Sequence, residues 1–540
     1  MSTLSTASEG HNTIDVAQDI QVPARQTRWL QGALIGGLAA LIASGIMLWT
    51  GRAWGGAILA QLMSERIIDL TPLSVFSRIL AALESNAKPL TLLGLTLVQT
   101  FAGAGIGAFY ARRVAGTDVL RRLTGGLVLS LLVWLFLSIV AAPLGSVGLF
   151  ARDAQNAGAT QATFVLAALS FGAIVATFLP WPFLRNATTA PEASRRRLIQ
   201  LAGISVLALP ALVATGYIGR YVQQLRTTFS PELATVTEDG PGEFDFAGMP
   251  EEITPTDAFY VVSKNFVDPE VDSSGWALEV GGLVEQPFSL SYTDLIARDS
   301  VEFTATLECI SNDVGGPYIS NAVWRGFPLS ELLNDAGLQD GIVDLEMHAA
   351  DGYVESMPIE KALDDVMLVH TMNGEPLTYG HGYPARLIVP GILGMKNVKW
   401  VTLLIAVNQD IQGYWQERGW SDIATMLTMS RIDTPKKGYK ATLGETVQIG
   451  GVAFGGELGI SRVEISLDDG ATWHDARLSD PLSDLSWRLW SHDYLADQPG
   501  TRKMVIRATN GEGVLQEIAE QPPLPAGSTG YHRESFEVVG

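Results

Sequence analysis

The C-terminal half of this 540-residue sequence contains the stretch Phe303-Thr-Ala-Thr-Leu-Glu-Cys309-Ile-Ser-Asn312-Asp-Val-Gly-Gly316. Its first residues predict a strand that leads directly into the only cysteine of the chain. A polar loop with two glycines follows, and loops at strand ends commonly carry functional groups. A single cysteine excludes an intrachain disulfide and a zinc–thiolate cluster.

Two interpretations of Cys309 remain open from the residues alone. A lone cysteine is commonly a small buried hydrophobic residue. Alternatively, its thiolate binds a soft metal, which would also protect it from oxidation outside the cytoplasm. Because no histidine cluster accompanies Cys309 in the sequence, the remaining metal ligands would have to come from a cofactor.

Short strands continue on both sides of this stretch. Residues 276–280, 386–390 and 398–407 are predicted strands, and 328–336 is a predicted helix. After residue 435, six or seven short strands alternate with turn signals such as Asp468-Asp469-Gly470, which predicts a β-sandwich of immunoglobulin type.

Charge-free intervals organise the N-terminal half. Each is long enough for the about 20 residues with which a helix crosses a bilayer. The intervals are 29–51, 89–111, 123–151, 154–184 and 198–219. We therefore expect five transmembrane helices, and apolar positions at helical spacing in 53–84 predict helices at the membrane interface.

The loop charges predict an orientation. Arginine-rich loops at 112–122 and 185–197 should be cytoplasmic, which places the long C-terminal half outside the cytoplasm of the cell membrane. Ser194-Arg195-Arg196 resembles a twin-arginine export signal, although positive-inside flanking also explains these arginines. All seven histidines lie outside the five intervals and no C-x-x-C-H motif occurs, so we expect no haem in this chain. The anchor is interpreted as a tether or as a docking platform.

Charge differs strongly between the two halves. The net charge is −21, but residues 1–230 hold 17 Lys and Arg against 9 Asp and Glu, whereas the remainder holds 19 against 48. A soluble half this acidic repels phosphate backbones, so the charge argues against nucleic-acid binding.

Several segments of the soluble half occur in a characteristic order. They are Ile253-Thr-Pro, Ala305-Thr-Leu-Glu-Cys309, Met372-Asn-Gly-Glu-Pro-Leu, His381-Gly-Tyr-Pro-Ala-Arg386-Leu-Ile-Val-Pro-Gly, Val398-Lys-Trp400, Val463-Glu-Ile-Ser-Leu-Asp-Asp-Gly-Ala-Thr-Trp473 and Trp487-Arg-Leu-Trp490. With these segments, residues 253–540 resemble the sulfite oxidase family of molybdopterin enzymes. The resemblance implies one pterin dithiolene on molybdenum, with Cys309 as the thiolate ligand of the metal.

The resemblance also implies a division of the chain. We expect a membrane anchor (1–226), a polar, turn-rich linker (227–252), an α+β molybdopterin-binding oxidoreductase domain (253–434) and an immunoglobulin-like domain of the dimerising type (435–540). The expected partners are the lipid bilayer, a separate electron carrier and a second copy of the chain.

Site residues are carried over from the family motifs. Cys309, Asn312 and Trp420 are the expected catalytic residues. The expected cofactor-binding residues are Cys309, Tyr260, Ser263, Lys264, Ser356, His381, Arg386, Lys396, Asn397, Val398 and Lys399. Taken singly, His381 is explained as a turn residue, and Arg386 and Lys399 as solvated charges at strand ends. Within the family motif, the two cations are expected to bind the phosphate of the cofactor.

The sequence departs from the sulfite-oxidising pattern at three places. Sulfite-oxidising members have two arginines after the asparagine that help hold sulfite, whereas this sequence has Asp313 and Val314 after Asn312. Trp420 stands in place of the family's active-site tyrosine. The arginine of the family's N-terminal cofactor segment falls near Val262. Trp420 is also explained by ordinary packing. Arg325, Arg418 and Arg533 remain as candidate anion contacts.

The family resemblance implies oxygen-atom transfer by a molybdenum oxidoreductase of EC class 1, with electrons exchanged with a separate carrier. The departures disfavour sulfite and leave a sulfoxide or N-oxide reductase as an alternative. A cofactor-free binding or assembly module on the same scaffold is the alternative from another class.

Overall fold

The computed structural model describes residues 24–72, 75, 79, 83, 86–114, 118–154, 156–179, 208–225, 235–236, 242–266 and 268–540. The chain divides into two compact units. One unit contains residues 1–46, 96–134 and 165–216, and the other contains 47–95, 135–164 and 217–540. The second unit therefore joins parts of the N-terminal helices to the whole β-rich half.

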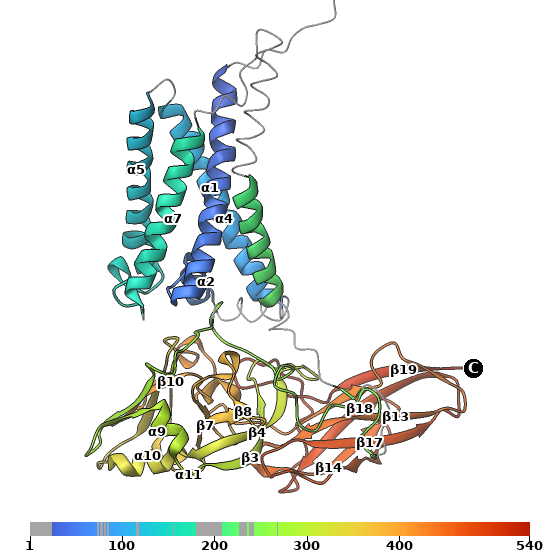
Figure 1. Ribbon diagram of the computed structural model, residues 1–540. Helices are drawn as coiled ribbons and strands as arrows, with labels where there is room; N and C mark the ends of the chain where they lie inside the picture. The colour runs from blue at the N-terminus through green and yellow to red at the C-terminus, as the bar shows by residue number, and fades with distance from the viewer. Residues whose placement is uncertain are drawn as a thin grey trace, which may run out of the picture. The chain divides into compact units, whose positions relative to one another are not determined.

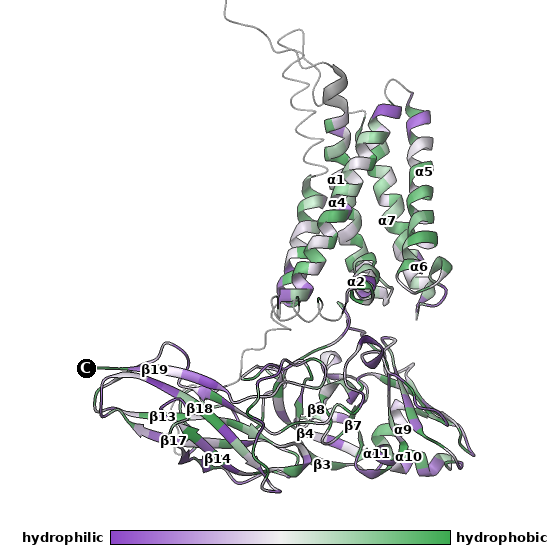
Figure 2. Cartoon of the chain, turned by 180° about the vertical axis from the view of Figure 1, so that it is seen from behind, coloured by the Kyte–Doolittle hydropathy of each residue, from purple (hydrophilic) through white to green (hydrophobic). Residues whose placement is uncertain are grey.

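Long apolar helices form the N-terminal half (Figures 1 and 2). They are α1 (Ala24–Trp54), α4 (Ala87–Arg113), α5 (Val119–Phe136), which continues through a π-helical turn η2 (Leu137–Ala141) into α6 (Ala142–Leu144), and α7 (Ala157–Phe178). Four stretches are long and apolar enough to cross a membrane: Trp29–Trp54, Ala87–Arg113, Val119–Leu144 and Ala157–Phe178.

Four of the five predicted spans thus have candidate helices among the described residues. Of the fifth interval, 198–219, residues 208–219 are helical and 198–207 lie outside the described residues, so this span stays a prediction. The twin-arginine motif at 194–196 also lies outside them. Within 53–84, α2 (Leu59–Leu70) confirms a predicted helix.

Glycines bring α1 and α4 into close contact. A Cβ added at Gly36 would lie 2.2 Å from the carbonyl oxygen of Gly103, and one added at Gly107 would lie 2.2 Å from that of Gly32. Small residues four apart on both helices let two backbones approach, as at helix interfaces in membranes. On another face of α4, the large apolar side chain of Phe101 is 73% exposed.

One mixed sheet and one antiparallel sheet form the first part of the β-rich half. One has the order β2 (Phe288–Ser291), β1 (Ala277–Gly282), β10 (Val401–Val407), β5 (Asp344–Ala349), β6 (Val354–Pro358), and only its β1–β10 pair is parallel. The other has the order β3 (Val301–Glu308), β4 (Ile319–Pro328), β7 (Met367–Met372), β8 (Glu375–Pro376), with β9 (Arg386–Ile388) also paired to β7. The α-helices here are α9 (Tyr292–Ala297), α10 (Leu329–Ala336) and α11 (Ile359–Asp364).

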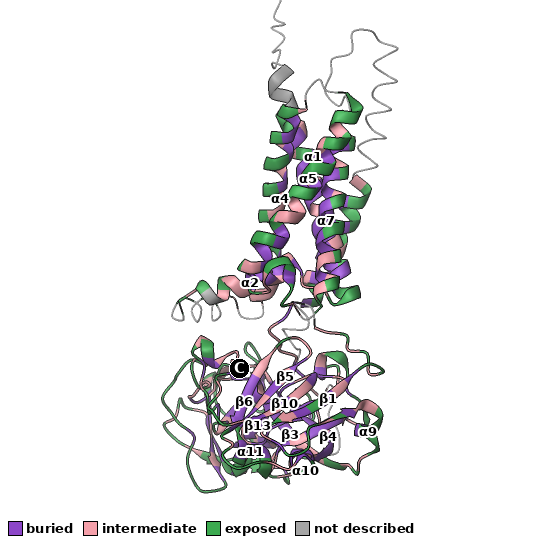
Figure 3. Ribbon diagram, turned by 90° about the vertical axis from the view of Figure 1, so that its left-hand side faces the viewer, coloured by how far each residue is buried: buried purple, intermediate pink, exposed green. Residues whose placement is uncertain are grey.

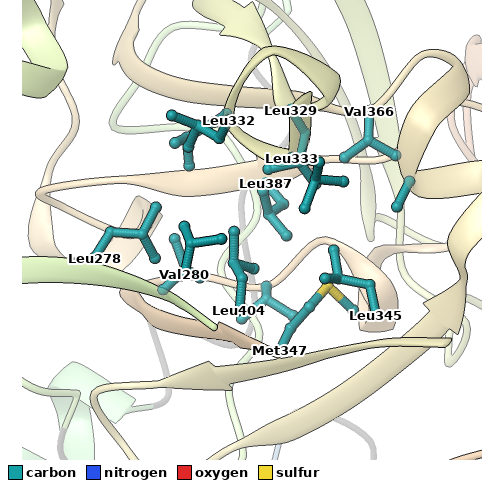
Figure 4. Close-up of a cluster of buried hydrophobic side chains, with 14 of the residues drawn as sticks. Leu278, Val280, Leu329, Leu332, Leu333, Leu345, Met347, Val366, Leu387 and Leu404 are labelled. Carbon is teal, nitrogen blue, oxygen red and sulfur yellow. The ribbon is translucent and has the colours of Figure 1, made fainter. Parts of the chain in front are cut away.

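The first of these sheets packs on the helices through an apolar core. Leu278 and Leu404 of the sheet and Leu332 and Leu333 of α10 are fully buried in one cluster (Figure 4). Short 3₁₀ turns connect the strands: η4 (Tyr379–His381), η5 (Gly394–Lys396) and η6 (Gln416–Arg418). The described part of 227–252 is also packed, because Phe246 and Met249 are buried against Trp487 and its neighbours.

The C-terminal part is a β-sandwich. One sheet has the order β11 (Met429–Thr434), β13 (Thr446–Phe454), β17 (Arg488–Leu495), β16 (Arg477–Leu478), and the other β12 (Lys440–Thr442), β19 (Arg533–Val539), β18 (Gly500–Asn510), β14 (Ile460–Ser466), β15 (His474–Asp475). The two sheets share an apolar core with Trp490 from the first and Ile506 and Phe536 from the second. Buried residues alternate with exposed ones along part of β19. Strand β13, labelled in Figure 3, is largely buried. The strands predicted after residue 435 are confirmed.

His532 makes the stability of this sandwich pH-dependent. Its Nδ1 accepts a hydrogen bond from the backbone N–H of Ile432 at 3.0 Å. Burial lowers the pKa of His532 to about 4. Because the unfolded chain binds a proton near pH 6.5 and the folded chain does not, stability falls as pH drops from 6.5 toward 4.

We expect the free energy of unfolding to fall by about 2 kcal/mol between pH 7 and pH 5 on this account. His532→Asn keeps an acceptor near the Nδ1 position but does not titrate, so the variant should lose clearly less stability over this range. Thermal unfolding of both proteins at the two pH values measures the difference. Equal pH dependence in both proteins would assign the effect to other groups.

Candidate functional site

Cys309 lies at the end of β3, where the strand passes into the glycine-containing loop. The residue is 9% exposed, and its backbone N–H donates to the carbonyl of Tyr318 at 3.0 Å. Its Sγ lies 3.1 Å from the hydroxyl oxygen of Ser311. Burial raises the pKa of the thiol, and hydrogen bonds from Ser311 oppose this shift. A metal bound to the sulfur would favour the thiolate despite the burial.

Asn312 holds the Cys309 loop in place and does not line the cavity at Cys309. Its Nδ2 donates to Glu308 Oε1 at 3.0 Å, and its Oδ1 accepts from the N–H of Tyr318 at 2.9 Å. Burial raises the pKa of Glu308 to about 7. The predicted catalytic role of Asn312 therefore remains a prediction, and its observed contacts position the loop.

The β-sandwich also holds this loop. Ser528 Oγ donates to the carbonyl of Asn312 at 2.7 Å, and Arg431 Nη1 donates to the carbonyl of Gly316 at 3.0 Å. Gly315 has φ = +78°, and a Cβ there would lie 2.2 Å from a ring nitrogen of His532. The position of Cys309 thus depends on both parts of the β-rich half.

A cavity of about 340 Å³ adjoins Cys309. Of the predicted site residues, it is lined by Tyr260, Ser263, Lys264, Cys309, Arg386, Asn397, Val398, Lys399 and Trp420. These residues come from segments that are far apart in the chain. The fold therefore brings most of the predicted residues together around one space.

Four cationic side chains line this cavity, Lys88, Lys264, Arg386 and Lys399, and the last two are buried without an ion pair among the described residues. Arg386 is 5% exposed; its Nη1 and Nη2 donate to the carbonyls of His381 and Asn397, both at 3.2 Å, while its Nε has no partner. Lys399 Nζ donates to the carbonyl of Gly380 at 3.0 Å and lies 4.3 Å from the ring centroid of Trp400.

Neither cation has a carboxylate within ion-pair distance among the residues that the structure describes. Burial lowers the pKa of Arg386 to about 10 and that of Lys399 to about 8. Buried charges are costly unless they are paired. An unpaired donor and two buried cations without an ion pair in one cavity fit an anionic ligand.

The segment 260–264 forms another side of the cavity. Lys264 Nζ donates to the carbonyl of Asp351 at 3.0 Å, and Ser263 Oγ donates to Asp268 Oδ1 at 2.5 Å. Burial raises the pKa of Tyr260 well above its usual value, and the neighbouring Cys309 raises it further. A neutral phenol therefore stands beside the thiol.

Three predicted cofactor-binding residues lie outside the cavity lining. Lys396 Nζ pairs with Glu355 Oε1 at 3.2 Å and donates to the carbonyl of Ser356 at 2.7 Å, while the Ser356 hydroxyl donates to the carbonyl of Ile411. His381 Nε2 lies 2.8 Å from the carbonyl oxygen of Thr256, and burial lowers the pKa of His381 to about 4. These side chains support the walls, and their direct contact with a cofactor stays a prediction.

The candidate anion contacts also lie elsewhere. Arg325 is exposed on β4, the Arg418 guanidinium lies 3.7 Å from the ring centroid of Tyr414, and Arg533 pairs with Asp469 at 2.7 Å. Trp420, by contrast, lines the cavity; it is 7% exposed and its Nε1 has no hydrogen-bond partner.

Several lining residues were not predicted. Ser311 and Tyr353 line the cavity, as do Ile67 and Ile68 of α2 and Lys88 at the start of α4. Ser311 was identifiable from its place in the quoted loop. The helical residues carried only an amphipathic pattern, which indicates an apolar face but does not show what covers it.

No group of three or more His, Cys, Asp or Glu side chains suited to a metal occurs in the described ranges. A metal at Cys309 would thus take its other ligands from a cofactor. The donor set around the cavity fits such a group: one thiol, two buried cations and the unpartnered Arg386 Nε.

Comparisons with known proteins agree with this geometry. Residues 265–415 match the model "Oxidoreductase molybdopterin binding domain", and 421–517 match "Mo-co oxidoreductase dimerisation domain". Mitochondrial sulfite oxidase of Homo sapiens is 30% identical over 288 residues, which cover 44% of this chain and 52% of that protein. Nitrate reductase [NADH] 1 of Arabidopsis thaliana is 27% identical over 320 residues, 47% of this chain and 35% of that protein.

A solved structure is also similar. The sulfane dehydrogenase SoxCD of Paracoccus pantotrophus matches with a TM-score of 0.47 at 26% identity, covering 54% of this chain and 84% of that one. The chain spans about half the length of the mitochondrial sulfite oxidases that it matches.

Proposed function

We propose that this chain is a membrane-anchored molybdenum enzyme. The proposal is supported by the C-terminal half, which matches the two domain models of sulfite-oxidase-family molybdopterin oxidoreductases. The enzyme transfers an oxygen atom to or from a small substrate on the extracytoplasmic face of the cell membrane. The observation that carries the proposal is the cavity that joins the thiol of Cys309 to the buried cations Arg386 and Lys399.

The residues of this chain have distinct parts in the proposed site. Cys309 supplies the protein's bond to the metal, and Arg386, Lys399 and Lys264 bind the cofactor phosphate and pterin. When bound, the molybdopterin cofactor supplies two-electron chemistry with exchange of an oxygen atom. Asn312 and the sandwich residue Ser528 hold the loop, so the sulfur stays at a fixed position during turnover.

The surroundings of Cys309 favour a substrate with little charge. Asp313 and Val314 take the place of cations, and Arg325, Arg418 and Arg533 do not line the cavity. Beyond the cations assigned to the cofactor, the described lining offers sulfite Lys88, whose Nζ donates to the carbonyls of Ser263 and Asn265. Trp420 and Trp415 present aromatic surface instead, which favours a sulfoxide or N-oxide.

The remaining parts of the proposal concern assembly. The anchor consists of the apolar N-terminal helices, with the arginine-rich loops in the cytoplasm and export through the motif at 194–196. The immunoglobulin-like domain, 435–540, would pair two copies, in keeping with the dimerisation model that it matches. Electrons pass to or from a separate carrier, because no haem-binding motif occurs in the sequence.

Elemental and pterin analysis tests the proposal. Protein purified from molybdenum-replete cells is expected to contain equimolar molybdenum and pterin, and dye-linked assays with sulfite, sulfoxides, N-oxides and nitrate then identify the substrate. Metal-free and pterin-free protein from such cells would favour the alternative of a binding or assembly module. The departures from the family pattern at Asp313, Val314 and Trp420 also favour that alternative.

A further inference from the structure

The residues that line the cavity come from two parts of the chain. Those of the β-rich half combine basic groups such as Arg386 and Lys399 with aromatic and aliphatic side chains such as Trp420. The second group comes from residues 64–91; besides the polar residues Ser64, Thr71, Lys88 and Thr91 it contains an apolar wall made of Ile67, Ile68, Ile79 and Leu83. All these residues belong to the same compact unit.

Polar contacts hold this apolar wall against the soluble half. Lys88 Nζ, in the first turn of α4, donates to the carbonyls of Ser263 and, at 2.7 Å, of Asn265. On α2, Gln61 Nε2 donates to Asn265 Oδ1 at 3.3 Å, and Glu65 lies 3.9 Å from Lys264 Nζ. The wall is thus bound to the segment that is expected to contact the cofactor.

The apolar wall cannot satisfy the hydrogen-bonding groups or the charge of the cofactor. A phosphorylated pterin is anionic and rich in hydrogen-bonding groups, and isoleucine and leucine side chains neither donate nor accept hydrogen bonds. Burial of an apolar ligand against the same side chains is favourable, at about 25 cal/mol for each Å² removed from water. The second group therefore points to a ligand with an apolar part.

Trp420 adds a specific requirement. Its Nε1–H is buried and has no acceptor, although it lines the cavity. A buried donor of this kind normally has a partner. A ligand oxygen would satisfy it, and a neutral oxygen suffices because the indole is uncharged.

We propose that the site takes an uncharged, lipophilic substrate that carries an acceptor oxygen, of the alkyl sulfoxide or N-oxide type, and that this substrate enters from the bilayer. The inference rests on the proposed function, whose substrate class it specifies. Entry from the bilayer is direct, because the helix that follows the apolar wall in the chain, α4, continues from Lys88 into a candidate membrane span. The N-terminal half then forms part of the substrate site in addition to anchoring the chain.

Binding measurements on the cofactor-loaded full chain in detergent test the substrate class. The probes are alkyl methyl sulfoxides with methyl, butyl and octyl chains, titrated by calorimetry. Each methylene buried against the wall is expected to tighten binding by about fourfold. Ile68→Asn should abolish most of this dependence on chain length and leave the methyl compound unaffected.

Leu70→Asn is the matched control, because Leu70 lies on the same helix but is 68% exposed and outside the cavity lining. Should Ile68→Asn fail to fold, Ile79→Asn changes another lining residue. Trp420→Phe keeps an aromatic ring without the N–H donor. It should weaken sulfoxide binding by about tenfold but leave binding of the corresponding sulfides unchanged.

Four results would overturn the inference. They are affinity independent of chain length, equal losses in Ile68→Asn and Leu70→Asn, a co-purified phospholipid that octyl methyl sulfoxide does not displace, and preferential binding of sulfite. These failures are distinct from failure of the proposed function, because molybdenum content and the effect of Cys309→Ser are measured separately.

Discussion

Replacement of Cys309 by serine is expected to reduce turnover by about a thousandfold or more with every substrate. Loss of a residue that merely supports a metal ligand costs about 10- to 100-fold, and Cys309 is the proposed ligand itself. The fold should persist, because one buried sulfur is exchanged for oxygen and the N–H of Cys309 keeps its bond to Tyr318. Turnover, molybdenum content and the thermal midpoint together measure the effect.

Ser311→Ala is the companion variant. It removes the hydroxyl 3.1 Å from Sγ but leaves the sulfur in place, so metal should remain bound and activity should fall far less. The spectroscopic signature of the metal should shift, because this hydroxyl contacts the sulfur directly. Full activity in Cys309→Ser would remove Cys309 from the metal site and leave it as a buried hydrophobic residue.

Arg386→Met is expected to have opposite effects on the loaded and the empty protein. Cofactor binding should weaken by about 30-fold or more, because truncation of one partner of a buried charge pair costs about 2–5 kcal/mol. Without cofactor, the variant should be at least as stable as the wild type, since it removes a buried cation whose pKa burial lowers to about 10. Pterin content and thermal midpoints of both forms measure the two effects.

Arg325→Met is the matched control for this substitution. Arg325 is exposed on β4 and does not line the cavity, so its loss should change neither cofactor content nor stability appreciably. Equal cofactor loss in both variants would mean that the effect is not specific to the cavity. Unchanged cofactor content in Arg386→Met would mean that Arg386 only supports the protein structure around the cavity and does not bind the cofactor.

The predicted site divides according to how each side chain is directed. Cys309, Arg386 and Lys399 lie beside strand ends, and their place in short motifs sufficed to bring them to one cavity. Ser356, His381 and Lys396 come from equally motif-like segments, but their side chains bind backbone carbonyls and Glu355 behind the lining. Local turns decide this direction, as at Gly382, where φ is +108°.

The N-terminal half was largely predictable from the sequence. Charge-free length identified apolar helices, because the apolar character of a segment is a property of that segment by itself. Four of the five predicted intervals contain helices long and apolar enough to cross a membrane, and the last interval is only partly described.

The sequence by itself determined the strand that ends at Cys309, the sandwich that follows and the apolar helices that precede, because periodicity and turn residues act locally. Only the tertiary structure decided that Ile68 and Lys88 meet the cavity beside Cys309, and that Ser528 of the sandwich holds the Cys309 loop. Such contacts join segments that are distant in the chain, as Lys88 and Ser263 are, and they depend on complementary packing that no single segment encodes.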